Sequence, residues 1–456
     1  GEKIERRMAL DHQPSLNTLN RELEWLNQMI TYRFSDYFQQ TNEVLYPQAP
    51  DLSMDSSYYA HSIRELQIGD SGRLLILIAL APHLRPAVFD IFFTKNATID
   101  RVYAEFGGLK GEKHSGFMPT GETAVFIIAG GDLDKRFELQ RLLDEESPLY
   151  KKNVLSLGFT NEYEPMWSGE LILSKEYLTK FTLNEDYQPR FSPSFPAHLL
   201  STKLNWEDAV FDQNVLEEIN HIKSWIEHEQ QIMQGWGLEK FLKRGYRALF
   251  HGPPGTGKSM TAGLLGKSHG MDVYRVDLSS VVSKYIGETE KNLSKLFDMA
   301  ESKNWILFFD EADALFSKRM KTQSSNDMFA NQQVAYLLQR IEDYHGVVIL
   351  ASNFKDNIDE AFLRRFQSLV YFPKPSSNLR LELWQKHFSN FELGDVDLAK
   401  IAKNYEITGG SIINVLRYCS IASAKRKNNV VQEKDILIGI KRELSKEGIT
   451  INSEAH

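Results

Sequence analysis

The feature of this sequence that most constrains its fold is the eight-residue run GPPGTGKS, from Gly252 to Ser259. It fits the pattern G-x-x-x-x-G-K-[ST] and stands between an apolar run of strand length, Tyr246–Phe250, and a helical pattern. Its glycines allow backbone angles that turn successive N–H groups toward one point, next to the N-terminus of the following helix. Such a turn forms a cradle for anions, and we expect it to bind phosphate groups.

The residues of this turn are the candidate ligands of a nucleotide. The Lys258 ammonium would contact the β- and γ-phosphates, and the Ser259 hydroxyl would ligate magnesium. ATP with Mg²⁺ is therefore the expected ligand, and the alternative is an ordinary glycine-rich turn. The candidate nucleotide-binding residues are Gly252, Pro253, Pro254, Gly255, Thr256, Gly257, Lys258, Ser259 and Met260.

A second run, ILFFDEAD at Ile306–Asp313, ends an apolar strand in carboxylates. Acidic side chains at the end of a buried strand are costly without a partner, so a bound cation and water are the expected company. We expect Asp310 to hold the magnesium ion and Glu311 to polarise the attacking water. Taken alone, the run is also compatible with a strand followed by a polar helix cap.

Two later segments carry further polar candidates. The apolar run Val347–Ala351 is followed two residues on by Asn353, whose amide we assign to orienting the same water. The run DEAFLRRF at Asp359–Phe366 holds adjacent arginines. A guanidinium from a neighbouring subunit can stabilise the negative charge of phosphoryl transfer, so Arg364 and Arg365 are both candidates, with no choice between them. The simpler interpretations are a turn asparagine and solvated arginines.

The order of patterns along the chain predicts its domains. Strand-length apolar runs alternate with helical patterns up to Phe372, as in a parallel sheet with helices on both faces, and only helical patterns follow. A proline-rich run precedes this region. The expected domains are 1–187, a mainly helical module; 188–200, a linker; 201–374, an αβα nucleotide-binding subdomain; and 375–456, a helical lid. The expected strands are Tyr246–Phe250, Asp272–Val276, Trp305–Phe309, Val347–Ala351 and Leu369–Phe372, and the expected lid helices are Asn378–Phe388, Asp397–Asn404, Ser411–Lys425 and Glu433–Glu443.

The N-terminal half is predominantly helical in pattern. Apolar residues at spacings of three and four predict an amphipathic helix over Leu16–Phe38. The apolar run Leu74–Ala81 is shorter than the roughly 20 residues that cross a bilayer, so it predicts a core helix. A helix is also expected from Asp132 to about Glu146, and short strands at Gly169–Leu173 and Lys180–Leu183. Helices capped by a small strand ribbon resemble a winged-helix module.

Composition limits the partners. A formal charge of −8 and a pI near 5.9 leave no global positive field for holding nucleic acid by counterion release. The single cysteine, Cys419, suits a reducing cytosol and is expected to be a buried helix residue. The charged start GEKIERR lacks the apolar stretch of a signal peptide. We therefore expect a cytoplasmic protein that binds neither nucleic acid nor membrane.

In this order, Gly252–Ser259, Ile306–Asp313, Asn353 and Asp359–Phe366 resemble the AAA+ ATPases, over about half of the chain. The resemblance implies an α/β fold, with a P-loop αβα subdomain of strand order 5-1-4-3-2 and a helical lid. It also implies a homo-oligomeric ring, most often a hexamer, with ATP bound between subunits.

Further positions match the same family. The resemblance implies that Ala209 and Val210 meet the adenine, that His387 lines its site, and that Gly409 and Gly410 belong to a second sensor. In that sensor, Gly410-Ser411 replaces the commoner residue pairs. The run SKYIGETEKNL resembles the loop that lines the central pore of substrate-threading members, although a core tyrosine at a helix start is the alternative. Its candidate substrate-gripping residues are Lys284, Tyr285, Ile286 and Gly287.

The N-terminal half carries a second resemblance, to the ATPases encoded with bacterial contractile injection systems, which are phage-tail-like particles. It lies on DLSMDSSYYAHSIRELQIGDSGRLLILIALAPHLRP, FGGLKGEKHSGFMPTGETAVFIIAG and LNWEDAVF. It implies that the chain handles protein cargo or particle components. Two functions stay open: an ATP-driven motor that remodels, unfolds or threads proteins, and a nucleotide-switched assembly factor that binds partners without translocation. The intact Asp310-Glu311 and Tyr285-Ile286 pairs favour the motor.

Overall fold

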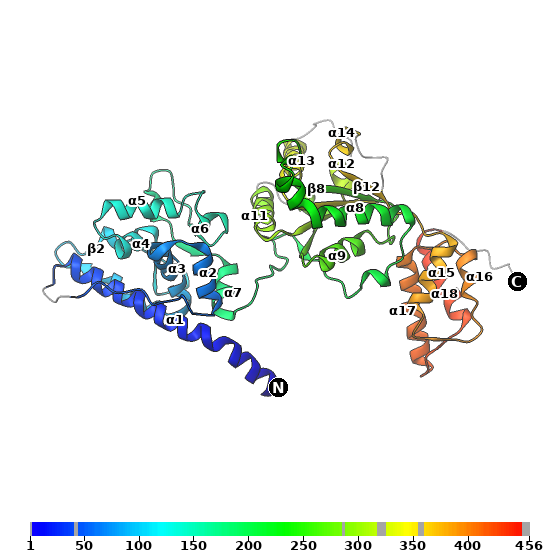
Figure 1. The fold of residues 1–456 in the computed structure, drawn as a ribbon, viewed down its shortest axis with the longest axis horizontal. Helices are drawn as coiled ribbons and strands as arrows, with labels where there is room; N and C mark the ends of the chain where they lie inside the picture. The colour runs from blue at the N-terminus through cyan, green and yellow to red at the C-terminus, as the bar shows by residue number, and fades with distance from the viewer. Residues whose placement is uncertain (1, 41–43, 285–287, 317–324, 354–359, 449–456) are drawn as a thin grey trace. The chain divides into compact units, whose positions relative to one another are not determined.

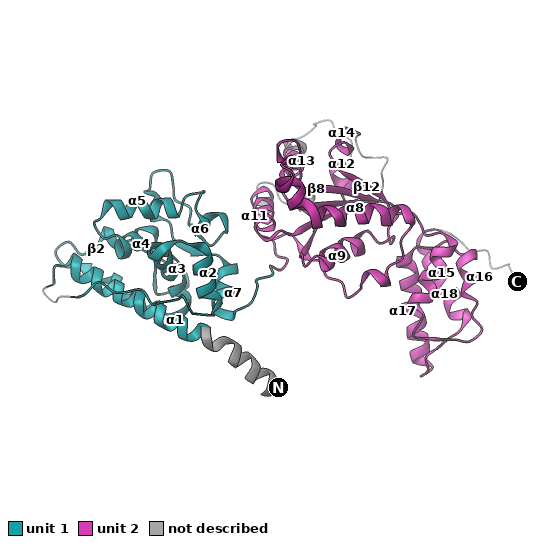
Figure 2. Cartoon of the chain, viewed as in Figure 1, with its two compact units in different colours: residues 1–188 teal, residues 189–456 magenta. Residues whose placement is uncertain are grey.

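The computed structural model of the chain divides into two compact units, residues 1–188 and 189–456 (Figures 1 and 2). The structure describes residues 2–40, 44–284, 288–316, 325–353 and 360–448. The division falls next to the predicted start of the linker at residue 188.

Unit 1 is built around α3 (Gly69–Leu84), in which every residue from Gly72 to Ala81 is buried. The prediction of a core helix there is confirmed. Within the described residues, no single helix has the length and apolarity to cross a membrane, although α3 together with η1 (Pro86–Phe93) would, were it not for a bend of 100° between them.

Helix α1 (Glu2–Tyr37) packs on α3 through the predicted apolar face. Leu19, Leu23 and Phe34 on that face are buried, whereas Tyr37 at its end is 37% exposed. The helix begins well before the predicted Leu16.

The small elements of unit 1 differ from expectation in two ways. There are three two-stranded antiparallel ribbons among the described residues rather than one, so the winged-helix assignment stays a prediction. Lys180–Leu183, predicted as a strand, ends helix α7 (Lys175–Leu183). The Ser174 hydroxyl caps that helix by accepting from the Tyr177 amide, and Phe181 packs one turn later on the same face. The other elements are α2 (Tyr58–Leu66), β1 (Lys95–Asn96), β2 (Arg101–Val102), η2 (Ala104–Phe106), β3 (Leu109–Lys110), β4 (Phe117–Met118), α4 (Gly121–Ile128), α5 (Leu133–Leu142), α6 (Pro148–Lys151), β5 (Leu155–Leu157), η3 (Met166–Ser168) and β6 (Leu171–Leu173).

Unit 2 begins with a six-stranded sheet in the order β12-β8-β11-β10-β9-β7. Five strands are parallel, and numbered along the chain their order is 5-1-4-3-2, as the resemblance implied. Each overlaps the segment predicted for it, because a parallel strand covered on both faces is apolar along its whole length. These strands are β8 (Tyr246–His251), β9 (Val273–Asp277), β10 (Ile306–Asp310), β11 (Val347–Ser352) and β12 (Ser368–Tyr371).

Helices cover both faces of this sheet. Alternate residues of each strand enter different apolar clusters, one shared with α11 (Glu288–Lys303) and α13 (Ser325–Asp343), the other with α8 (Gln213–Gln230) and α9 (Lys258–Ser268). The predicted αβα arrangement is therefore present. Shorter elements connect these helices: η4 (Trp206–Asp208), η5 (Gln231–Gly235), η6 (Leu238–Lys240), α10 (Leu278–Lys284), α12 (Asp313–Phe316) and α14 (Glu360–Leu363).

The segment 188–200 is not a free linker, which corrects the prediction. Its prolines keep the chain extended, and β7 (His198–Leu199) adds antiparallel to the edge strand β9. Phe195 and Ala197 are buried in the sheet's core. The Pro189 carbonyl accepts a hydrogen bond of 3.2 Å from the Tyr274 hydroxyl. The ordered part of unit 2 therefore starts at the division itself.

The chain ends in a lid of four helices, as predicted: α15 (Ser377–His387), α16 (Leu398–Asn404), α17 (Gly409–Lys425) and α18 (Glu433–Lys446). Their core holds Trp384, Ile412 and Cys419, all fully buried. Burial raises the pKa of the Cys419 thiol to about 12, so this cysteine is inert, as expected. A two-stranded parallel ribbon that the patterns did not predict joins β13 (Glu392–Leu393) to β14 (Val430–Val431).

Candidate functional site

The glycine-rich turn follows β8 directly and leads into α9. Gly252, Gly255 and Gly257 have φ angles of 144°, 76° and 101°, which side chains other than glycine's rarely adopt. A Cβ at Gly252 would also lie 2.2 Å from the Phe372 carbonyl oxygen. The backbone thus requires glycine at these positions for the reason the sequence suggested, and α9 begins at Lys258, immediately after the turn.

Lys258 lies inside this turn with 8% of its surface exposed. Its Nζ donates to the carbonyl oxygens of Gly252, at 2.7 Å, and of Pro253, at 2.9 Å. Burial lowers the pKa of the Lys258 ammonium, and the carboxylates of Asp310 and Asp313 oppose that shift. The ammonium is therefore held by its own loop, in the position from which it would meet phosphate oxygens.

The predicted acids stand at the end of β10. Asp310 is the last residue of the strand, and its Oδ1 accepts from the Glu311 amide at 2.8 Å. Glu311 has φ 55°, a left-handed conformation that costs a residue with a side chain about 1–2 kcal/mol. The Ala312 amide bonds to the Ala351 carbonyl at 2.9 Å, which ties this turn to the neighbouring strand. Such local strain is typical of functional sites.

Strand β11 brings the third polar group. Its last residue, Ser352, donates to an Asp313 carboxylate oxygen, and Asn353 follows at the strand end. Because β8, β11 and β10 are parallel neighbours, their carboxyl ends meet at one edge of the sheet. Asn353 therefore lies with the acids around one cavity, as predicted.

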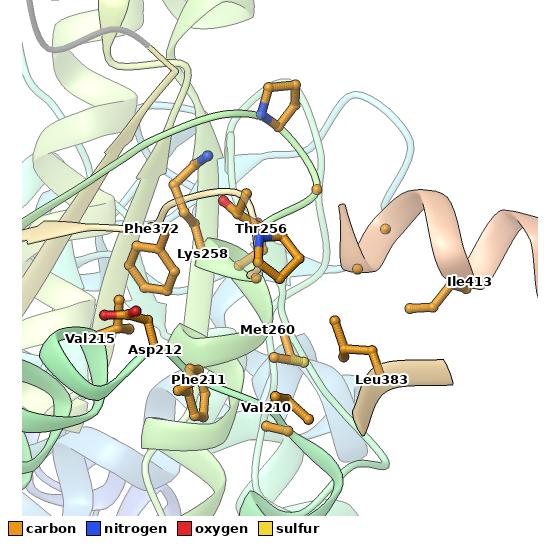
Figure 3. Close-up of a pocket in the computed structure, with 18 of the residues that line it drawn as sticks. Val210, Phe211, Asp212, Val215, Thr256, Lys258, Met260, Phe372, Leu383 and Ile413 are labelled. Carbon is orange, nitrogen blue, oxygen red and sulfur yellow. The ribbon is translucent and has the colours of Figure 1, made fainter. Parts of the chain in front are cut away.

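This cavity has a volume of about 440 Å³ and lies between the sheet edge and the lid. Figure 3 shows Leu383 and Ile413 of the lid facing Val210 and Met260 across it. One end is polar and the other apolar, as a triphosphate joined to a base requires. The predicted residues that line it are Ala209, Val210, Pro254, Gly255, Thr256, Gly257, Lys258, Ser259, Met260, Asp310, Glu311, Asn353, His387, Gly409 and Gly410.

The apolar end contains residues that the sequence reasoning missed. Leu379 and Leu383 line it together with His387, at four-residue spacing along α15. That spacing was a visible signal, because it places three side chains on one helix face. Burial and the neighbouring Lys386 lower the pKa of His387, so its imidazole is neutral at pH 7. The remaining additions to the lining are Leu204, Asp208, Phe211, Asp212, Val215, Phe372, Pro373, Pro375 and Ile413.

The lid reaches the phosphate end through backbone groups. The Gly410 amide donates to the Gly255 carbonyl at 2.9 Å, and a Cβ on Gly410 would lie 3.0 Å from the Gly255 Cα. The predicted second-sensor residues therefore contact the turn itself, and glycine at this position permits the approach.

Several predicted residues lie away from the cavity. Gly252 and Pro253 shape the turn without lining it. Arg364 and Arg365 are exposed and do not line it either. The proposed pore residues Tyr285, Ile286 and Gly287 lie outside the described residues, as does the side chain of Lys284, the last residue of α10.

The donor set at the polar end fits magnesium with a nucleotide. Among the described residues there is no cluster of three or more histidine, cysteine or acidic side chains that would form an all-protein metal cage. Magnesium typically binds through one or two carboxylates together with substrate phosphates and water. The Ser259 hydroxyl and Asp310 carboxylate supply oxygens of that kind beside the phosphate cradle.

Comparison with known proteins agrees with this geometry. The family described as the ATPase family associated with various cellular activities (AAA) matches residues 248–374. The proteasome-activating nucleotidase of Methanopyrus kandleri is 30% identical over 242 residues, 50% of this chain and 55% of that protein. Katanin p60 A-like 1 of Homo sapiens, an ATPase-containing protein, is 34% identical over 262 residues, 54% of this chain and 50% of that protein. The chain thus spans about half the length of the curated relatives it matches.

Proposed function

We propose that this chain, which carries an ATP-hydrolysing AAA domain, works as a homo-oligomeric ring, a hexamer, that uses ATP to remodel, unfold or thread proteins. The observation that carries the proposal is a single cavity in which the glycine-rich turn, the acids Asp310 and Glu311, and the Asn353 amide meet lid residues. A binding site without the acids would not need this arrangement.

Each polar residue has a role in this proposal. The turn amides and Lys258 hold the β- and γ-phosphates, while Ser259 and Asp310 hold Mg²⁺, which when bound neutralises the charge that develops on them. Glu311 accepts the proton of the attacking water, and Asn353 orients that water. The apolar residues of α15 and of the segment at Ala209 hold the base and exclude water.

The two arginines divide the remaining work. The Arg365 Nε lies 2.8 Å from a Glu342 carboxylate oxygen of its own chain, and the guanidinium stacks over Phe362. The Arg364 side chain makes no hydrogen bond or ion pair with any residue that the structure describes, and it is exposed. We therefore assign Arg364 to the phosphate of the adjacent protomer, and Arg365 to fixing the turn that presents it.

Unit 1 is the proposed docking module for the client, a winged-helix-like domain in our sequence interpretation. The support is the resemblance of its sequence to ATPases of contractile injection systems, so the proposed clients are effectors or components of such particles. The net acidity of the chain argues against nucleic acid as the client.

Replacing Glu311 with Gln tests the ATPase assignment. The amide cannot accept the water's proton, so turnover should fall by about 10²–10⁴-fold while ATP still binds. The ATP-bound ring should accumulate, which light scattering can measure, and it should retain client in a pull-down. Glu239→Gln, at an exposed position, is the matched control. Turnover near the normal rate in Glu311→Gln would show that the base is wrongly assigned.

Replacing Tyr285 with Ala separates the motor from the assembly factor. A threading motor should keep its ATPase rate but stop unfolding a tagged fluorescent substrate, because the side chain that grips the polypeptide is gone. An assembly factor would be indifferent to this change in both measurements.

A further inference from the structure

The carboxylate of Asp310 already has a cationic partner within the chain. Arg275 lies on β9, the parallel neighbour of β10, where it is opposite Phe308 and two residues short of the strand end. Its Nη2 lies 2.7 Å from Asp310 Oδ2. Since Oδ1 accepts from the Glu311 amide, both carboxylate oxygens have a protein donor.

The ion pair lies on the side of the sheet where the nucleotide turn is. Phe308 packs in the apolar cluster that contains Ala262 and Leu265 of α9, and side chains two residues apart on a strand point to the same face. Arg275 and Asp310 therefore share the α9 face. Lys258 begins that helix, and Asp310 lowers the electrostatic cost of its buried ammonium.

The pair is open to exchange. The Arg275 side chain is 39% exposed and that of Asp310 is 22% exposed, so water reaches both. Exposed ion pairs contribute little to stability, and their partners separate easily. An arginine that turns away from Asp310 therefore finds solvent and loses little.

We propose that Arg275 competes with Mg²⁺ for Asp310 and thereby sets the magnesium concentration that nucleotide binding requires. The inference rests on the proposed function, in which Asp310 holds the ion. Two cations a few ångströms apart repel each other, so the guanidinium must move or the metal must bind more weakly. Because the triphosphate brings its own negative charge, Mg²⁺ delivered with ATP displaces Arg275, whereas free Mg²⁺ does not.

The alternative role for Arg275 is to orient Asp310 for the metal, and the two roles predict opposite signs. If the guanidinium competes, removing its charge lowers the magnesium requirement. If it orients the carboxylate, removing it raises the requirement.

The experiment is a MgCl₂ titration of the full chain with a fluorescent, non-hydrolysable ATP analogue, started in chelator. Arg275→Met should lower the MgCl₂ concentration at half-maximal binding about tenfold, because one repelling charge is gone. Affinity for the analogue in chelator should change much less. Arg275→Lys, which keeps the charge, should stay near wild type, and Arg417→Met, at an exposed position on α17, is the control.

Arg275→Gln, which keeps a hydrogen-bond donor, should reproduce the shift and serves if Arg275→Met does not fold. A midpoint that rises, or one that stays with wild type in the folded variant, would overturn the proposal. If wild type binds no analogue at any MgCl₂ concentration, the proposed function fails instead, so the two failures are distinct.

Discussion

Buried charges have different partners in the two units. In unit 1 the Glu22 carboxylate, fully buried, accepts from Arg73 Nε at 2.9 Å and from the Tyr59 hydroxyl at 2.6 Å. Arg73 also donates to the Pro50 carbonyl and stacks on Trp25. Each charge in this network has several fixed partners from the fold, which is what low-dielectric burial demands.

In unit 2 the charges beside the cavity have partners that a ligand can replace. Lys258 bonds to carbonyls of its own turn, and Asp310 bonds to a partly exposed arginine. The difference teaches that burial of a charge does not by itself indicate function. A closed network of fixed partners specifies the fold, whereas a charge with replaceable partners at a cavity indicates a binding site.

The largest effect should come from Arg364, whose side chain has no partner among the described residues. Arg364→Ala should lower kcat by about 10³–10⁵-fold with little loss of ATP affinity, since the guanidinium would act only on transition-state charge. Steady-state ATPase assays and nucleotide binding measure the two quantities. In mixtures with wild type, the variant should lower activity more steeply than dilution. A larger loss for Arg365→Ala would reverse our assignment, and Arg417→Ala controls for the loss of an exposed charge.

The closed network in unit 1 predicts a loss of stability without a loss of nucleotide binding. Arg73→Met should lower the unfolding free energy of unit 1 by about 3–5 kcal/mol, because Glu22 stays buried without its cation. Hydrogen exchange of unit 1 peptides in the full chain measures this, with peptides of β8 as internal reference. Adding Glu22→Gln should restore part of the loss. Equal destabilisation of unit 2 would break the comparison.

Lys258 should show the opposite behaviour. Lys258→Met should weaken ATP binding about 100-fold, as expected for the loss of charge-assisted hydrogen bonds to phosphate. Thermal stability without nucleotide should not fall, because the change removes a cation that burial disfavours. Titration with a fluorescent ATP analogue and a melting curve test both, beside Lys240→Met at an exposed position. A lower melting temperature would place Lys258 among the structural charges.

The smallest effect concerns His387, which is neutral in the folded lid. Its pKa lies below the usual value of about 6.5, so between those two pH values the unfolded chain binds a proton that the folded chain does not. Stability is therefore complete above pH 6.5 and falls as the pH drops through this window. Melting temperatures from pH 7.5 to 5 should show a loss of at most about 2–4 °C that His387→Asn removes. Identical pH profiles would contradict the assignment.

Sequence patterns predicted the sheet and the polar end of the site because local rules govern both. Gly252–Ser259 encodes its own turn, and each parallel strand is apolar from end to end. Prediction failed where distant partners decide. Lys180–Leu183 has strand residues, but a serine cap and a neighbouring helix make it helical. Likewise, no local signal tells that Arg275 meets Asp310, since their contact depends on the register between β9 and β10.

Strand β7 has a mechanical consequence. The only covalent connection between the units passes through a two-residue edge strand, hydrogen-bonded to the strand that carries Arg275. Tension applied to that connection would peel β7 from its neighbour before it loaded the interior strands, because edge pairing of two residues is the weakest ladder in the sheet. Peeling would lengthen the tether and uncover Tyr274, leaving the nucleotide turn on β8 unstrained.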